Sequence, residues 1–213
     1  MGGADRSDLS VLVYDELSSV LADFATSEPV RVSPRCALVY LHRSESEKSA
    51  PKVQLCYSKD PKLLAPMGLT EYLDELGIPR RRLTFQLEHP QLIEALVRLD
   101  DYIRRLAFEK CKDWFGKELS EADVSSLYEP LVGRDGERSA LKASVDRHEV
   151  RLWRESDDGY GPGGADDLQR LGCCWPNVAI GPIWFLPQRF GCALRCTDIL
   201  LFDRSRPQFP FRT

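Results

Sequence analysis

Apolar and polar residues alternate along the last third of the chain, which is the pattern of strands with one buried face. The clearest case is residues 181–203, GPIWFLPQRFGCALRCTDILLFD. This stretch predicts a hairpin: a short aromatic strand with Trp184 and Phe185 turns at 187–191, and residues 192–202 return as the longest strand. Such a hairpin more often forms core than an active site, so a functional role depends on the neighbouring strands.

Further strands are expected where β-branched and aromatic residues gather between turn signals. Residues 37–41, 53–57 and 83–87 fit this description. Residues 173–180 are another candidate, which we expect at a sheet edge because Pro176 lacks the N–H that a central strand donates.

A second hairpin is predicted between residues 141–145 and 150–153. The alternation would place Lys142, Arg151 and Trp153 together on one face. Such a face suits a phosphate-bearing ligand, although a polar sheet face with one capping tryptophan gives the same pattern.

Helical periodicity occurs in three segments. Residues 14–24 are amphipathic, residues 90–115 carry the clearest apolar stripe, and residues 120–128 open with a capping box, SEAD. A helical turn capped by Thr70 is also expected within 61–76.

Composition limits the choice of partner and compartment. With 213 residues, 43% of them apolar, the chain can bury a sizeable core in one large domain or two small ones. The formal net charge of -4 gives no overall attraction to nucleic acid, so a polyanion site must come from a local concentration of Lys and Arg. No apolar run approaches the roughly 18 residues that a membrane span requires, and we predict an intracellular protein with no membrane partner.

We divide the chain into three parts. Residues 1–35 are expected to form an N-terminal helical extension, residues 36–203 a single domain with inserted helices near 90–128, and residues 204–213 a basic C-terminal tail. The acidic, glycine-rich loop 155–167 lacks the regular spacing of calcium ligands, so we predict no metal there.

The side chains that carry catalysis elsewhere form no motif in this chain. The seven cysteines are odd in number and lack the spacing of a disulfide framework or a zinc site, so we expect reduced thiols. His42, His89 and His148 lie outside recognisable motifs, and residues 159–164 are not followed by the Lys and Ser or Thr of a phosphate loop. We therefore predict a protein that is not an enzyme, with no catalytic residues, no cofactor and no metal.

Six short segments follow one another in an order that carries a resemblance. They are APMGLTEYL (65–73), LTFQL (83–87), CKDWFGKE (111–118), LYEPLV (127–132), LKASV (141–145) and GPIWFLPQRFGCAL (181–194). In this order the chain resembles the single-stranded-DNA-binding proteins of nucleocytoplasmic large DNA viruses and related algal sequences, over roughly residues 37–202.

The resemblance implies an OB-like antiparallel β-barrel elaborated with helices, within a β-rich α+β fold. It also implies sequence-nonspecific binding of single-stranded DNA in replication, recombination or repair, in a nuclear or viral replication compartment, with replication proteins as further partners. Related phage proteins end in an acidic tail, whereas residues 204–213 are basic and aromatic, so recruitment through such a tail is left in doubt.

The expected mechanism is physical: bases stack on aromatic rings while Lys and Arg contact the phosphates. The stacking candidates are Trp153, Trp184, Trp114 and Phe190. The phosphate-binding candidates are Lys142, Arg151, Arg189, Arg195, Lys112 and Lys117. Trp175 is expected to be buried beside Pro176 and is left out.

Other interpretations stay open at this point. Exposed aromatic and basic residues also predominate at protein interfaces, so a protein-interaction or structural module is the main alternative, and a hydrolase or transferase is less favoured. Residues Arg80 to Arg82 fit a solvated turn or a phosphate-contacting patch. The preference between DNA and RNA, the strand order, the source, and whether the protein forms a homo-oligomer are not decided by the sequence.

Overall fold

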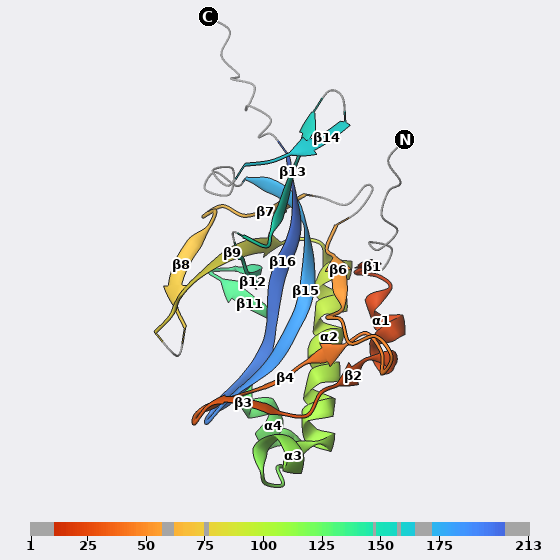
Figure 1. The fold of residues 1–213 in the computed structure, drawn as a ribbon, viewed down its shortest axis with the longest axis vertical. Helices are drawn as coiled ribbons and strands as arrows, with labels where there is room; N and C mark the ends of the chain where they lie inside the picture. The colour runs from red at the N-terminus through yellow and green to blue at the C-terminus, as the bar shows by residue number, and fades with distance from the viewer. Residues whose placement is uncertain are drawn as a thin grey trace, which may run out of the picture.

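The fold is β-rich α+β; the described residues form a 14-stranded sheet, a two-stranded sheet of β2 and β5, and four α-helices (Figure 1). The computed structural model describes residues 11–56, 62–74, 77–146, 148–156, 159–164 and 172–202. The strands are β1 Val11–Val13, β2 Ala25–Thr26, β3 Val30–Ser33, β4 Cys36–Val39, β5 Leu41–His42, β6 Lys52–Gln54, β7 Leu63–Leu64, β8 Thr70–Leu73, β9 Pro79–Leu87, β10 Tyr128–Glu129, β11 Val132–Asp135, β12 Arg138–Ser144, β13 Arg151–Ser156, β14 Gly159–Pro162, β15 Cys173–Leu186 and β16 Arg189–Phe202. The helices are α1 Leu17–Val20, the 3₁₀ helix η2 Leu21–Asp23, α2 Pro90–Glu109, α3 Cys111–Phe115 and α4 Glu121–Leu127.

The predicted C-terminal hairpin is confirmed and forms the long axis of the molecule. β15 and β16 each have 14 residues and pair antiparallel, from Cys173 opposite Phe202 to Leu186 opposite Arg189. Along β16 the side chains of Phe190 and Leu194 are buried, whereas that of Arg195 is exposed. The hairpin therefore has an inner face, which joins the core, and an outer face.

Strand pairings around the hairpin form a ring. β15 pairs with β7, β7 with β9, β9 with β12, β12 with β16, and β16 returns to β15. Two of these contacts are narrow, with one residue pair each: Leu64 opposite Gln86, and Ser144 opposite Arg195. The ring is held mainly by the long β9–β12 and β15–β16 ladders.

The second predicted hairpin is wrong. β12 pairs antiparallel with β9 and β11, and β13 pairs parallel with β16, so β12 and β13 are not partners. Both instead run in the same direction along one edge of β16, with Ser144 opposite Arg195 and Arg151 opposite Asp198. The intervening segment shifts the chain along β16 without reversing it, which the period-two pattern alone could not distinguish from a turn.

Residues 11–35 are not a helical extension. They form β1, which pairs parallel with β6, two short helical turns and β3, which pairs with β4. Leu12, Leu17 and Phe24 belong to the same buried cluster as the main sheet. Burial of this apolar surface ties the segment to the sheet.

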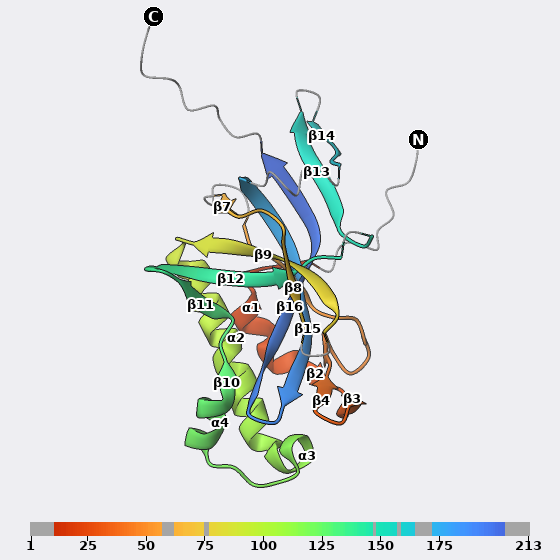
Figure 2. The same ribbon diagram turned by 90° about the vertical axis from the view of Figure 1, so that its left-hand side faces the viewer.

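The predicted helices after residue 90 are present, and they cover the inner side of the hairpin (Figure 2). The buried stripe of α2 includes Leu92, Leu96 and Ile103. His89 caps this helix by accepting a hydrogen bond from the Leu92 N–H at Nδ1, 3.3 Å away. The capping box that opens α4 is also confirmed.

Two local predictions fail for identifiable reasons. Pro176 lies in the central strand β15 and not at a sheet edge. It lies between the residues that pair with β6 and those that pair with β7, so no partner strand requires an N–H from it, and its C=O accepts a hydrogen bond from the Leu55 N–H. Thr70 begins strand β8 rather than a helical turn, because residues 70–73 pair with β9.

Part of the sequence interpretation lies outside the described residues. The basic tail 204–213 falls there, as do residues 157, 158 and 165–167 of the acidic loop 155–167. Within the described part of the chain, no helix is both long and apolar enough to cross a membrane.

Candidate nucleic-acid interface

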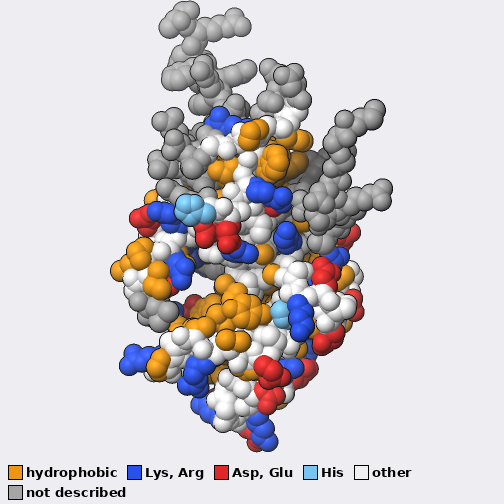
Figure 3. Space-filling view, viewed as in Figure 1, with side chains coloured by type: hydrophobic (Ala, Val, Ile, Leu, Met, Phe, Trp, Pro, Cys, Tyr) orange, Lys and Arg blue, Asp and Glu red, His pale blue; other side chains and the backbone are white. Residues whose placement is uncertain are grey.

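The outer face of the hairpin presents aromatic side chains at two places with basic side chains between them. In Figure 3 hydrophobic groups gather over the upper end of the hairpin and again over its middle, and Lys and Arg lie between. Trp175 and Trp184 lie on this face of β15, nine residues apart, so an extended strand separates them by roughly 30 Å.

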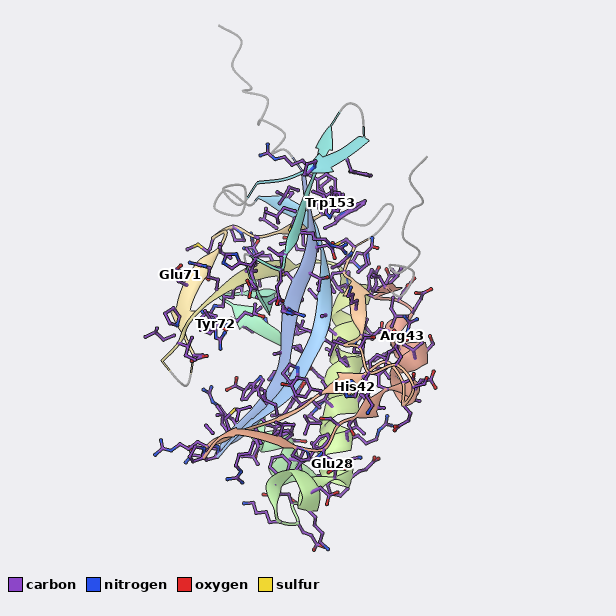
Figure 4. All side chains as sticks on the ribbon, viewed as in Figure 1. Glu28, His42, Arg43, Glu71, Tyr72 and Trp153 are labelled. Atoms are coloured by element: carbon purple, nitrogen blue, oxygen red, sulfur yellow. The ribbon has the colours of Figure 1, made fainter. Side chains whose placement is uncertain are left out.

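A groove of about 610 Å³ opens at the upper end of this face. Three aromatic rings line it: Trp153 from β13, Tyr160 from β14 and Trp175 from β15. The remaining lining residues are Val11, Gln54, Arg151, Asn177, Asp198 and Leu200. We call this the aromatic groove; Figure 4 labels Trp153 at its place on β13.

The sheet arranges the groove residues in cross-strand rows. Trp153 and Trp175 both lie opposite Leu200, one on each side of β16. Because neighbouring strands are about 4.8 Å apart, the two tryptophan backbones are separated by about 9.6 Å. We call Trp153, Leu200 and Trp175 the aromatic row.

Two residues further along the strands is a polar row. Arg151 lies opposite Asp198, Asp198 opposite Asn177, and Asn177 opposite Gln54. Arg151 Nε lies 2.6 Å from Asp198 Oδ1, and Asp198 is only 8% exposed. The carboxylate is thus held at the groove floor by an adjacent cation.

A third row, which we call the basic row, brings three cations together across the sheet. Lys52 on β6 lies opposite Ala179, and Ala179 lies opposite Arg195 on β16. The row continues through Ser144 to Arg82 on β9. The small side chains of Ala179 and Ser144 separate the three long cationic ones.

The cations of this face are only partly neutralised. Arg195 forms an ion pair with Glu149, both exposed. Lys52 and Lys142 form no ion pair within the part of the chain that the structure describes, and Lys142 lies on the same face as Ser144, two residues before it. Exposed ion pairs are worth about 0–1 kcal/mol, so a phosphate can replace Glu149 at little cost.

An arm formed by β8 and β9 flanks the face. The guanidinium carbon of Arg82 lies 4.8 Å from the centroid of the Tyr72 ring, and Glu71 pairs with Arg81 on the other side of the arm, 2.8 Å apart. Figure 4 labels Glu71 and Tyr72 there, and Figure 3 shows the surface hollowed between this arm and the lower part of the hairpin.

The lower end of the outer face carries Trp184 and Arg189. The Arg189 guanidinium lies 5.8 Å from the Trp184 ring and forms an ion pair with Glu129. Trp184 covers Gly191, where a Cβ would come within 2.7 Å of the indole. Trp184 is therefore half-exposed, with one side of its ring against the sheet.

The structure contradicts two of the predicted stacking residues, because both rings are buried. Phe190 is fully buried and Trp114 is 7% exposed. The Phe190 ring stacks on Phe185, and Trp114 contacts Phe185 edge-on, 5.4 Å between centroids. Neither ring offers a face to a base. Lys112 is 2.6 Å from Glu118 beside the same helix, α3, so Lys112 does not join the basic row.

Of the predicted residues, the structure places Trp153 and Arg151 at one end of the outer face, Arg195 and Lys142 in its middle, and Trp184 with Arg189 at the other end. It adds Trp175, Tyr160, Asn177 and Lys52, which the sequence interpretation left out, and Arg82, for which the sequence left a solvated turn and a phosphate-contacting patch open. Alternation along 173–180 could have placed Trp175 and Asn177 on one face. The contribution of Lys52 depends on strand order, which the sequence did not reveal.

The buried thiols of Cys174 and Cys196 point to the inner face of the hairpin, away from this outer face. Burial raises the pKa of the Cys196 thiol to about 12 and raises that of Cys174. Among the described residues no cluster of His, Cys, Asp or Glu is arranged to hold a metal ion.

Asp100 on α2 is a buried anchor. It accepts hydrogen bonds from the Tyr128 hydroxyl at 2.6 Å and from the Leu131 N–H at 3.0 Å. Burial raises the pKa of its carboxyl, and these hydrogen bonds oppose that shift. Asp100 therefore joins α2 to the segment that enters the sheet at β10, and has no contact with the aromatic groove.

Comparison with known proteins gives distant likenesses. No family model matches the chain, and no curated protein matches it. Among solved structures it is similar to the single-stranded DNA-binding protein from bacteriophage Enc34, at 12% identity and a TM-score of 0.43, over 87% of this chain and 94% of that one. The same phage protein in complex with ssDNA is similar at 12% identity and a TM-score of 0.42, over 81% and 93%. Likeness this distant assigns no function, and the resemblance to the viral and algal family stays a prediction.

Proposed function

We propose that this protein binds single-stranded DNA along the outer face of the β15–β16 hairpin, without regard to sequence over most of its length. The observation that carries this proposal is the set of three neighbouring rows: aromatic, polar and basic. Aromatic rings stack bases at about 1–3 kcal/mol per base, while cations neutralise phosphates. Bases of a single strand are available for stacking, whereas those of a duplex are already stacked.

The ring of strand pairings supports an OB-like barrel as the scaffold. Five strands take part, β7, β9, β12, β15 and β16, and the three rows use residues of β9, β12, β15 and β16 together with the neighbouring β6 and β13. We propose a role in replication, recombination or repair, where such strands occur. A negative net charge does not oppose this, since the basic row is local.

The test is fluorescence anisotropy of a labelled dT oligonucleotide with the wild type and two variants. Trp153→Ala and Trp175→Ala are each expected to weaken binding about tenfold, because each removes one stacking surface. Phe108→Ala is the matched control: its ring is 39% exposed, as Trp153 is, but lies on α2. Thermal melts establish that each variant is folded.

Salt dependence gives an independent readout. Lys52→Ala is expected to weaken binding to every sequence and to reduce the log–log salt slope by about 0.7, the contribution of one phosphate contact on a single strand. Equal affinity for duplex and single strand, or no effect of either tryptophan, would overturn the proposal. Absence of binding at low salt would favour the protein-interaction alternative.

A further inference from the structure

The three consecutive arginines near the start of β9 differ in their partners. Arg80 Nε lies 2.9 Å from Asp74 Oδ2, and Arg81 also forms an ion pair, at 2.8 Å. Arg82 forms no ion pair within the described part of the chain, and its guanidinium carbon lies 4.8 Å from the centroid of the Tyr72 ring. Of the three, Arg82 is the cation whose charge no described carboxylate compensates.

The Arg82 guanidinium is held in place but lacks an acceptor. The side chain is half-buried, and its Nε–H is buried with no hydrogen-bond partner. A buried donor without an acceptor destabilises a fold, and such groups are usually completed by water, an ion or a ligand. The terminal amino groups remain as the donors that a ligand can reach, and their planar arrangement matches the oxygens of a phosphate.

Strand pairing places Arg82 and Tyr72 on one face of the β8–β9 arm and Arg81 on the other. Tyr72 lies opposite Arg80, and Glu71 lies opposite Arg81. Opposite residues of an antiparallel pair share a face, and successive residues alternate between faces. Tyr72, Arg80 and Arg82 therefore lie on one side of the arm, and the Glu71–Arg81 pair lies on the other.

The face that carries Arg82 continues the outer face of the hairpin. Arg82 lies opposite Ser144 on β12, and Ser144 lies opposite Arg195 on β16. With about 4.8 Å between neighbouring strands, the backbones of Arg82 and Arg195 are about 9.6 Å apart. Arg82 is thus the end of the basic row at which the sheet continues into the arm.

Building on the proposed function, we propose that Arg82 is a fixed phosphate contact of the bound strand and that Tyr72 is the positioning residue that holds it. The aromatic ring attracts the guanidinium and orients its plane. A flexible cation loses side-chain freedom when it binds a phosphate, whereas one that is already held loses less. Arg195, by contrast, has to leave Glu149 before it can contact a phosphate.

The first experiment compares two neighbouring arginines on opposite faces of the arm. Binding of a labelled dT oligonucleotide is measured by anisotropy over a series of salt concentrations. Arg82→Ala is expected to weaken binding about tenfold and to reduce the log–log salt slope by about 0.7, the contribution of one phosphate contact on a single strand. Arg81→Ala is the matched control, because it removes the same charge from the other face. It should keep the wild-type slope and an affinity within about twofold of the wild type.

The second experiment tests whether Tyr72 acts through Arg82. Tyr72→Ala is expected to weaken binding about fivefold, whereas Tyr72→Phe keeps the ring and should bind as tightly as the wild type. In the Arg82→Ala background, Tyr72→Ala should have no further effect, because the cation that the ring positions is gone. Thermal melts establish that each variant is folded.

The outcomes separate the two proposals. If Arg82→Ala keeps the wild-type affinity and slope, or Arg81→Ala lowers the slope as much, Arg82 is not a fixed phosphate contact and single-strand binding stands. If Tyr72→Ala weakens binding equally with and without Arg82, the ring contacts the strand itself and the positioning role is wrong. If the wild type binds no oligonucleotide, the proposed function itself has failed.

Discussion

Aromatic residues at the turn end of the β15–β16 hairpin and on the strands beside its other end have opposite roles. At the turn end, Phe185 and Phe190 stack in parallel with centroids 5.6 Å apart, and Trp114 and Phe115 of α3 close over them. At the other end, Trp153 and Tyr160 are exposed. No helix of the described chain covers that end in Figure 1.

The difference is decided by whether a helix lies over the ring, not by residue type: α3 covers Phe185 on the inner face, whereas Trp184 at the same end is half-exposed on the outer face. A ring becomes core when a helix removes it from water and becomes a contact surface when the sheet face is left open. The hairpin alone therefore cannot reveal whether its aromatic side chains bind a ligand.

The largest expected effect is on stability, when a buried ring at the turn end and an exposed ring at the other end are each replaced by alanine. Phe190→Ala removes a fully buried ring and is expected to lower the free energy of unfolding by about 3–5 kcal/mol. Trp153→Ala should lower it by less than about 1 kcal/mol, because the ring is already exposed. Urea denaturation measures both. Similar costs for the two variants would contradict the assignment of one end to the core.

A smaller effect concerns how the turn end is anchored. Burial raises the pKa of Asp100 in the folded protein, so the carboxyl binds its proton more tightly there than in the unfolded chain. Tighter proton binding therefore adds to the free energy of unfolding. This contribution is fully present below the ordinary pKa of 3.8, and it is lost as the pH rises through the pKa of the folded state.

Asp100→Asn removes this titration while keeping the shape of the side chain. The stability of the wild type relative to the variant should therefore be greatest at pH 4 and below, and this difference should decrease toward pH 7. Asp101→Asn, on the exposed side of the same helix, is the matched amide substitution. A gap for Asp100→Asn that widens with pH would show that burial is not the dominant influence.

The smallest expected effect is on DNA affinity and concerns Arg195, which lies between the two ends of the hairpin. Glu149→Gln removes the ion pair with Arg195. A phosphate then no longer has to displace a carboxylate from the guanidinium. Affinity for dT should rise a few-fold at low salt, consistent with less than about 1 kcal/mol for an exposed pair. Glu94→Gln frees Arg98 on α2 in the same way and should leave binding unchanged.

The sequence was informative where local pattern decides structure. The β15–β16 hairpin, the stripe of α2 and the capping box before α4 each depend on neighbours close in sequence, and all three were predicted. Trp153 was predicted to lie on the binding face of the sheet, and its side chain is exposed.

Predictions that needed tertiary information failed. Phe190 alternates into the core, but only the position of α3 makes its burial complete. Lys52 and Arg82 reach the basic row through strand order, which no local pattern encodes. Trp175 was set aside because a proline follows it, although that proline occupies a gap between two partner strands.

The position of β16 in the chain also determines when the protein can fold. Residues 189–202 pair with β10, β12, β13 and β15, and the first of these partners lies about 60 residues earlier in the sequence. Until these residues are available, three strands that run parallel to one another have nothing to pair with on that side. Such long-range parallel pairing is slow to form. During synthesis the edges of β10, β12 and β13 that pair with β16 therefore stay unpaired until residues 189–202 have been made.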